Sequence, residues 1–190
     1  MKVTLNDSLL INSGTNRACY LHPDNIDRCV KIDISLNTKE TKREKRYYNY
    51  LLKRNIPFDM ISKYYGSIQT NLGNGEVVEL LRDYDGNVSM ELAQYLNSTL
   101  TESDMEYIKK LIRKLKEYLY RYKIYVKDLN SVNIVVQKFA KSGNARLVIV
   151  DGLAHSWYVF VLGCISDAFL MTNIEQSWKN FISTTMIQER

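Results

Sequence analysis

The run DLNSVN, residues 128–133, is the strongest indication of a fold in this sequence. It follows a long amphipathic helical pattern and leads into a short apolar run at residues 133–136. A second apolar run, residues 147–150, ends at Asp151, which Gly152 follows directly. Turn residues separate the two runs, so we expect a hairpin with Asp151 at the tip of its second strand. Glycine after Asp151 permits a sharp turn with no side chain in the way.

Residues of these types in this arrangement suit phosphoryl transfer. That chemistry needs a metal to neutralise the phosphates and a carboxylate to align the acceptor hydroxyl. We expect Asp128 to face the acceptor, Asn133 to turn its amide oxygen toward Mg²⁺, and Asp151 to supply the main metal carboxylate. The spacing D-x-x-x-x-N, followed by a later Asp-Gly, is that of the protein-kinase catalytic loop and metal aspartate. The alternative is a helix-ending turn with two polar caps, because D-x-x-x-x-N alone is a common pattern.

Other residues upstream follow the order of the remaining parts of a kinase cleft. Lys31 lies in the apolar run CVKI, where a lysine can hold the α- and β-phosphates of ATP. Glu44, in the next helical pattern, can pair with Lys31, and Glu40 competes with it for that role. Gly14, in NSGTNR, can let a strand-turn cover the nucleotide, although a single glycine makes a poor phosphate loop.

We therefore expect one α+β domain with the two-lobed fold of protein kinases. The N-terminal lobe, about residues 1–84, is predicted to hold an antiparallel sheet, and the reduced C-terminal lobe, about residues 85–190, to be helical. The backbone of Glu79 to Leu81 is expected to form the connector that meets the adenine edge.

Hydrophobic periodicity and turn residues predict the individual elements. The first half predicts strands at residues 9–11, 18–21 and 29–32, a helix from Asn37 or Thr38 to about Leu52, and a hairpin of residues 64–70 and 77–81 around NLGNGE. The second half predicts a short helix at 89–96, a long helix from Glu102 to about Tyr125 that opens with a Thr101–Asp104 capping box, the hairpin above, and one or two helices over 157–186.

Composition places the chain among ordinary globular proteins. Its 190 residues are 45% hydrophobic and 25% charged, enough for one large domain. Three cysteines without a CxxC pair and only two histidines argue against a zinc site and a disulfide framework. The N-terminus lacks the apolar stretch of a signal peptide, and the most apolar window, residues 157–171, is too short for a membrane span. We expect a soluble, cytoplasmic protein.

The net charge of +5 is compatible with binding of an anionic ligand. The basic residues gather at Lys39–Arg46 and Lys109–Lys127, and both stretches are also typical of solvated helix faces. No DNA- or RNA-binding pattern accompanies them, so nucleic acid is not expected as a partner. His22, before a proline, is typical of a turn, whereas His155, just beyond Asp151, is a candidate for a substrate-side role.

Four phrases of the sequence resemble the YrbL family, small bacterial proteins associated with the PhoP regulatory network that are kinase-like in sequence. The phrases are GTNRACYLHPDNIDRCVKI, EKRYYNYL, YYGSIQTNLGNGEVVELLRDYDG and DLNSVNIVV. The resemblance runs from about Gly14 to Asp151 and implies a kinase-like fold. It gives the roles described above to Lys31, Glu44, Asp128, Asn133 and Asp151.

The sequence also departs from the protein-kinase pattern. Val126 and Lys127 stand where histidine and arginine precede the catalytic aspartate, and no phenylalanine separates Asp151 from Gly152. No APE motif follows in residues 152–190. We therefore predict an ATP- and Mg²⁺-dependent phosphotransferase for a small or saccharide hydroxyl acceptor rather than a folded protein. The alternative is a pseudokinase-like module that senses a nucleotide or Mg²⁺ and regulates a protein partner.

Overall fold

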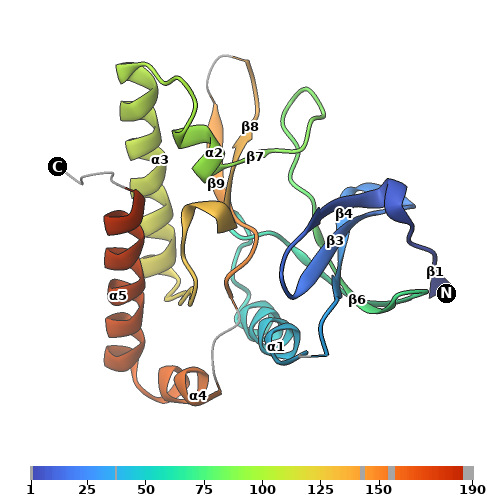
Figure 1. Cartoon of the computed structure of the whole chain (residues 1–190). Coiled ribbons are helices and arrows are strands. Elements are labelled where there is room, and N and C mark those ends of the chain that lie inside the picture. Colours follow the sequence, from blue (N-terminus) through green and yellow to red (C-terminus); the bar gives the residue numbers. More distant parts are fainter. Residues whose placement is uncertain (1, 37, 142–143, 154–156, 186–190) are drawn as a thin grey trace.

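A computed structural model describes residues 2–36, 38–141, 144–153 and 157–185 (Figure 1). The first part of the chain contains β1 (Lys2–Val3), η1 (Asp7–Leu9), β2 (Leu10–Ser13), β3 (Arg17–His22), β4 (Asn25–Asp33), α1 (Lys39–Lys53), β5 (Tyr64–Thr70) and β6 (Gly73–Glu79). The second part contains β7 (Met90–Glu91), α2 (Leu92–Leu96), α3 (Glu102–Arg121), η2 (Ser131–Asn133), β8 (Ile134–Lys138), β9 (Ala145–Ile149), α4 (Trp157–Ile165) and α5 (Asp167–Thr185).

Two sheets organise these elements. A six-stranded sheet has the order β1-β5-β6-β4-β3-β2, in which only β1 pairs in parallel, and a three-stranded sheet has the order β7-β8-β9. Figure 1 shows the six-stranded sheet on one side, the helices α3 and α5 on the other, and α1 between them. The predicted α+β class and the meander of β2, β3 and β4 are confirmed.

The main hydrophobic core joins both parts of the molecule. Buried residues of α1, β4 and β6 belong to the same cluster as those of α3, β8, β9 and α5. The segment between α1 and β5 adds main-chain links, because Ile149 N–H donates to the Met60 carbonyl (3.0 Å) and Ser62 N–H to the Ile149 carbonyl (2.9 Å). Ile61 between them has no exposed surface. The two walls of the cleft described below therefore belong to parts of the molecule that pack against a common hydrophobic core.

Most predicted elements are confirmed, and the long helix α3 shows how the sequence sets its ends. The capping box is present, with Thr101 Oγ1 accepting from Asp104 N–H (3.2 Å) and the Asp104 carboxylate accepting from Thr101 N–H (2.9 Å). The helix ends before Tyr125, however, because Lys123 adopts a φ of +51°. Ile124 N–H then donates to the Leu119 carbonyl (2.8 Å), a closure that satisfies the helix end.

Two further boundaries differ from the prediction. The turn of the β5–β6 hairpin is narrower than NLGNGE, because β6 begins at Gly73. A Cβ on Gly75 would lie 2.4 Å from Val30 Cγ1, so this glycine serves close packing within the sheet rather than the turn. Met90 and Glu91 form β7 instead of a helix start, because they pair with β8.

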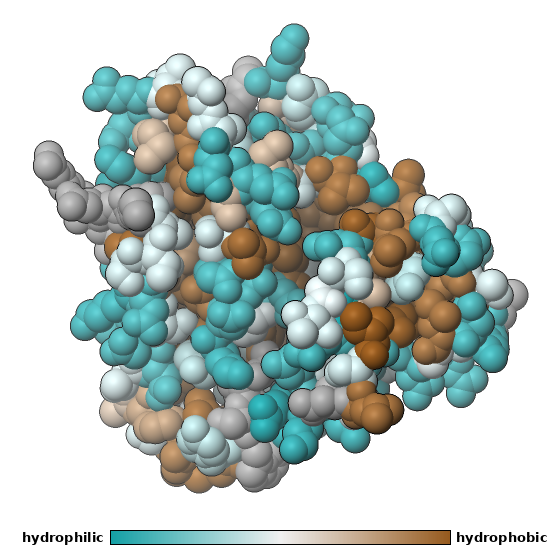
Figure 2. Space-filling model, viewed as in Figure 1, coloured by the Kyte–Doolittle hydropathy of each residue, from teal (hydrophilic) through white to brown (hydrophobic). Residues whose placement is uncertain are grey.

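The surface is mostly hydrophilic on the face that Figure 2 shows, with apolar side chains gathered over the six-stranded sheet. Exposed apolar residues of that sheet include Leu10, Ile11 and Ile26. Within the part of the chain that the structure describes, no helix is long and apolar enough to cross a bilayer.

Candidate functional site

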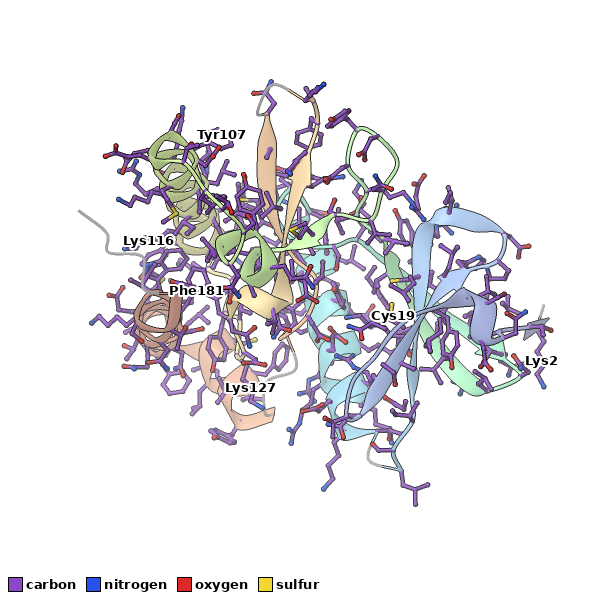
Figure 3. The ribbon with its side chains drawn as sticks, turned by 45° about the horizontal axis from the view of Figure 1, so that its top comes forward. Lys2, Cys19, Tyr107, Lys116, Lys127 and Phe181 are labelled. Atoms are coloured by element: carbon purple, nitrogen blue, oxygen red, sulfur yellow. The ribbon has the colours of Figure 1, made fainter. Side chains whose placement is uncertain are left out.

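A cleft of about 740 Å³ lies between the two parts of the molecule. Its N-terminal wall comes from the β2–β3 turn and the strands β3 and β4, and its C-terminal wall from the loop before β8 and the turn after β9. Figure 3 shows Cys19 on the N-terminal wall and Lys127 on the C-terminal side. Five of the predicted site residues line this cleft: Gly14, Lys31, Asp128, Asn133 and Asp151.

The C-terminal wall depends on Gly152. Its φ is +91°, a conformation that residues with a Cβ rarely adopt. A Cβ there would lie 2.4 Å from the Asp128 carbonyl oxygen and 3.2 Å from Asn133 Nδ2. Asp128 N–H also donates to the Gly152 carbonyl (3.1 Å). Glycine thus lets the turn that carries Asp151 lie directly against the loop that carries Asp128 and Asn133.

Asp128 is held in one orientation by two amide side chains. Its Oδ1 accepts from Asn130 Nδ2 (2.9 Å), and its Oδ2 accepts from Asn133 Nδ2 (3.1 Å). Asn133 Nδ2 also donates to the Asp128 carbonyl (2.9 Å), and Asn130 Oδ1 caps η2 by accepting from Val132 and Asn133 N–H. Because these donors leave carboxylate lone pairs available, the exposed Asp128 side chain can still accept a hydrogen bond from a ligand hydroxyl.

Lys31 and Glu44 form the predicted pair. Lys31 Nζ lies 3.4 Å from Glu44 Oε1 and donates to the Val150 carbonyl (2.8 Å). Glu44 is only 3% exposed, so its charge is held inside the protein by its cationic partners. The competitor Glu40 lies elsewhere along the cleft and accepts from Asn16 Nδ2 (3.3 Å). The structure therefore selects Glu44 as the partner of Lys31.

Arg17 is a second cation in the cleft that sequence analysis missed. Its Nη2 donates to both oxygens of Asp151, at 2.6 and 2.8 Å, and its Nη1 donates to Glu44 Oε2. Cys19 pairs with Lys31 across the β3–β4 ladder, and side chains two apart on a strand share a face. Arg17 and Cys19 are two apart in β3 and therefore lie on the same face of the sheet as Lys31. This alternation is the pattern from which Arg17 could have been found in the sequence.

The pKa values of these groups follow from their pairing. Burial disfavours the charged form of Lys31, but Glu44 and Asp151 outweigh it and raise its pKa above the ordinary value. The pKa of Arg17 is raised for the same reason. Burial by itself would raise the pKa of Asp151, yet Lys31 and Arg17 lower it to about 2. All three groups are therefore charged near neutral pH.

Asp151 and Asn133 are the residues that fit a divalent cation. Their side chains flank Gly152. Asn133 Nδ2 donates to Asp128, so the amide oxygen of Asn133 is the atom able to bind a cation. No cluster of three or more histidine, cysteine or acidic ligands occurs among the described residues. Mg²⁺ is commonly held by one or two protein oxygens together with phosphates, so this sparse donor set suits a metal that arrives with a phosphate ligand.

The remaining predicted residues lie differently. Gly14 is in the β2–β3 turn, where its N–H donates to the Arg17 carbonyl (2.9 Å). Glu79 and Leu81 do not line the cleft: Glu79 N–H donates to the Lys63 carbonyl (2.8 Å), and Leu81 is only 3% exposed. Their contact with an adenine ring stays a prediction. His155 lies outside the described residues, and His22 Nδ1 accepts from Asp24 N–H within a turn.

The sequence of this chain matches a known protein family. The profile of the family described as PhoP regulatory network protein YrbL matches residues 3–186. The YrbL proteins of Escherichia coli strain K12 and Shigella flexneri are each 29% identical over 184 residues, which is 95% of this chain and 87% of theirs.

A solved structure similar to this one is that of a mutant of the PknI kinase domain of Mycobacterium tuberculosis. The TM-score is 0.51 at 13% sequence identity, over 77% of this chain. The chain spans about 58% of the length of that kinase domain. At this identity the likeness shows the fold alone, and it confirms the predicted protein-kinase-like fold with an N-terminal sheet and a helical C-terminal part.

Proposed function

Because the chain belongs to the YrbL family and has a protein-kinase-like fold, we propose that it is an ATP- and Mg²⁺-dependent phosphotransferase that acts on a small or saccharide hydroxyl acceptor. The observation that carries this proposal is the meeting of Lys31, Asp128, Asn133 and Asp151 in one cleft, with the Lys31–Glu44 pair already formed. These residues come from separate parts of the sequence, and only folding brings them together.

Each residue has a role that its surroundings support. Lys31, fixed by Glu44, holds the nucleotide phosphates, while Asn133 and Asp151 hold the metal. When bound, the metal would neutralise the charge that develops on the transferred group. Asp128, oriented by Asn130 and Asn133, accepts a hydrogen bond from the acceptor hydroxyl and aligns it for attack.

The test is ATP turnover across a panel of hydroxyl acceptors, mainly sugars and saccharides. Asp128→Ala should lower turnover by about 10²–10⁴-fold, the usual contribution of a positioned general base. Asp24→Ala is a matched control, because Asp24 lies in an exposed turn and does not line the cleft. Turnover that is unchanged in Asp128→Ala would remove the proposal.

A second candidate is a pseudokinase-like module that binds nucleotide or Mg²⁺ without phosphoryl transfer and regulates a protein partner. The observation in its favour is that both oxygens of Asp151, the proposed metal carboxylate, accept from Arg17. Thermal stabilisation by ATP and Mg²⁺ without turnover of any acceptor in the panel supports this module. Acceptor-dependent ADP release excludes it.

A further inference from the structure

Arg17 occupies the side of Asp151 that a metal would need. A divalent cation binds a carboxylate through the oxygen lone pairs, at about 2.0–2.1 Å for Mg²⁺. In the structure both Asp151 oxygens instead accept from Arg17 Nη2, at 2.6 and 2.8 Å, and Oδ1 also accepts from Gly152 N–H (2.7 Å). The guanidinium and the cation therefore compete for the same carboxylate.

We propose that Arg17 makes metal binding at Asp151 conditional on a phosphate-bearing ligand. Without the ligand the guanidinium occupies the side of Asp151 where one nitrogen contacts both oxygens, and a phosphate group frees that side by taking the guanidinium over. The inference rests on the metal role that the proposed function gives to Asp151. It holds equally for a phosphotransferase and for a sensing module.

The balance of charge supports this role. Arg17 and Lys31 contribute two positive charges, and Glu44 and Asp151 two negative charges, all linked by ion pairs. The side chains of Arg17 and Lys31 are only 13% and 10% exposed, so water screens this group weakly. A lone divalent cation would bring an uncompensated charge of +2 beside two cations. A polyphosphate brings negative charge together with the metal.

The position of Arg17 allows the exchange. It is the first residue of β3, directly after the turn that lines the cleft, and that turn is closed by the hydrogen bond from Gly14 N–H. A guanidinium binds phosphate and carboxylate oxygens in the same paired geometry. Glu44 keeps Lys31 as a partner when Arg17 turns away. The exchange thus needs only a rotation of the Arg17 side chain.

The experiment measures two ligands separately on Arg17→Gln. Equilibrium dialysis measures the binding of Mn²⁺ alone. The variant should bind Mn²⁺ at least about tenfold more tightly than the wild type, a change of about 1.4 kcal/mol in binding free energy. Tripolyphosphate alone, titrated in EDTA by calorimetry, should bind the variant at least about tenfold more weakly. Opposite changes in one variant distinguish this role from general damage to the fold, which would weaken both ligands.

Two further variants test where the effect arises. Arg17→Gln combined with Asp151→Asn should lose the gained Mn²⁺ affinity. Lys31→Gln removes the same charge, but Lys31 Nζ is 3.6 Å from Asp151 Oδ2 and does not block its oxygens. Lys31→Gln should therefore tighten Mn²⁺ binding less than Arg17→Gln does. Arg28→Gln is the control for both ligands, because Arg28 lies over the Tyr65 ring outside the cleft lining.

The proposal is overturned if folded Arg17→Gln binds Mn²⁺ no better than the wild type. It is also overturned if Lys31→Gln gives an equal gain, or if the gain survives Asp151→Asn. Should Arg17→Gln fail to fold, Arg17→Lys keeps the charge without bridging Glu44 and Asp151 and should give a smaller gain, and no gain overturns the proposal. Absence of ATP turnover in the wild type, together with the expected changes in Mn²⁺ and tripolyphosphate affinity, counts against the phosphotransferase alone.

Discussion

Gly152 shows how one residue without a side chain can hold two charged ones in place. Gly152 has a φ of +91°, and a Cβ added there would lie 2.4 Å from the Asp128 carbonyl oxygen. Any larger residue must therefore move the backbone. Asp128, Asn133 and Asp151 meet at this turn, so the geometry of all three depends on it.

We predict that Gly152→Ala lowers the free energy of unfolding by roughly 2–4 kcal/mol, because left-handed strain of about 1–2 kcal/mol adds to the steric clash. Urea denaturation measures the loss. Gly86→Ala is the matched control, since Gly86 has a φ of +83° but no neighbour within 4 Å of a built Cβ. Equal losses in the two variants would show that the contact with Asp128 contributes nothing.

The charge of Asp151 makes a pH-dependent contribution to stability. Its folded pKa is lowered to about 2 from an ordinary value of 3.8. A lowered carboxyl pKa means that the ion pairs with Arg17 and Lys31 stabilise the protein fully above about pH 4. This stabilisation is lost as the pH falls through about 2.

We predict that the difference in unfolding free energy between the wild type and Asp151→Asn shrinks as the pH falls from about 4 to about 2. Chemical denaturation of both proteins between pH 6 and pH 2 measures this difference. Subtracting the variant's curve removes the titration of the other carboxylates. A difference that stays constant over this range contradicts the assigned pairing.

The start of the helix α3 is determined by residues close to it in the sequence. Thr101 and Asp104 satisfy each other's N–H groups, and the buried face that follows has helical spacing: Ile108, Leu111, Ile112, Leu115, Tyr118 and Leu119. The strand β7 is the opposite case. Its two residues have no strand pattern of their own and form a strand only because β8 offers hydrogen-bonding partners.

We predict that Thr101→Ala lowers the free energy of unfolding by about 1 kcal/mol, the usual cost of losing an N-cap side chain. Thr172→Ala is the control, because Thr172 is an exposed residue within α5 whose hydroxyl donates to the Ala168 carbonyl. Alanine is the better helix former there, so that change should be neutral or slightly stabilising. Thermal denaturation of both variants measures the two effects.

At the scale of the whole molecule, the shared core ties the two walls of the cleft together. Tyr48 of α1 packs in the same cluster as Leu115 of α3 and Ile149 of β9. We propose that the described chain unfolds as one cooperative domain. Movement of one wall relative to the other would then be limited by this core.

We predict that Ile61→Ala, which empties a fully buried position at the junction, costs about 2–5 kcal/mol and lowers the stability of both parts equally. Hydrogen exchange of β4 and α3 amides measures the stability of each part, and circular dichroism measures the unfolding of the whole chain for comparison. Ile26→Ala, at a position 62% exposed, should change stability by no more than about 0.5 kcal/mol. Exchange that rises in only one of the two elements would contradict a single domain.

The features that depend on neighbouring residues could be predicted from the sequence alone. The alternation and helical spacing of apolar residues predicted the strands and helices, and turn and cap residues marked many of their ends. The run DLNSVN and the Asp151–Gly152 turn were visible as candidate chemistry for the same reason. Backbone hydrogen bonding and side-chain periodicity act over a few residues, so these patterns can be recognised in the sequence.

The pairing of the charges, in contrast, depends on how whole elements pack in the folded chain. Arg17 and Asp151 are separated by 134 positions, and their contact depends on how the six-stranded sheet lies against the C-terminal part. The choice of Glu44 over Glu40 likewise required the orientation of α1, because both lie on the same helix. An ion pair between distant residues follows from packing of whole elements, which no local pattern records.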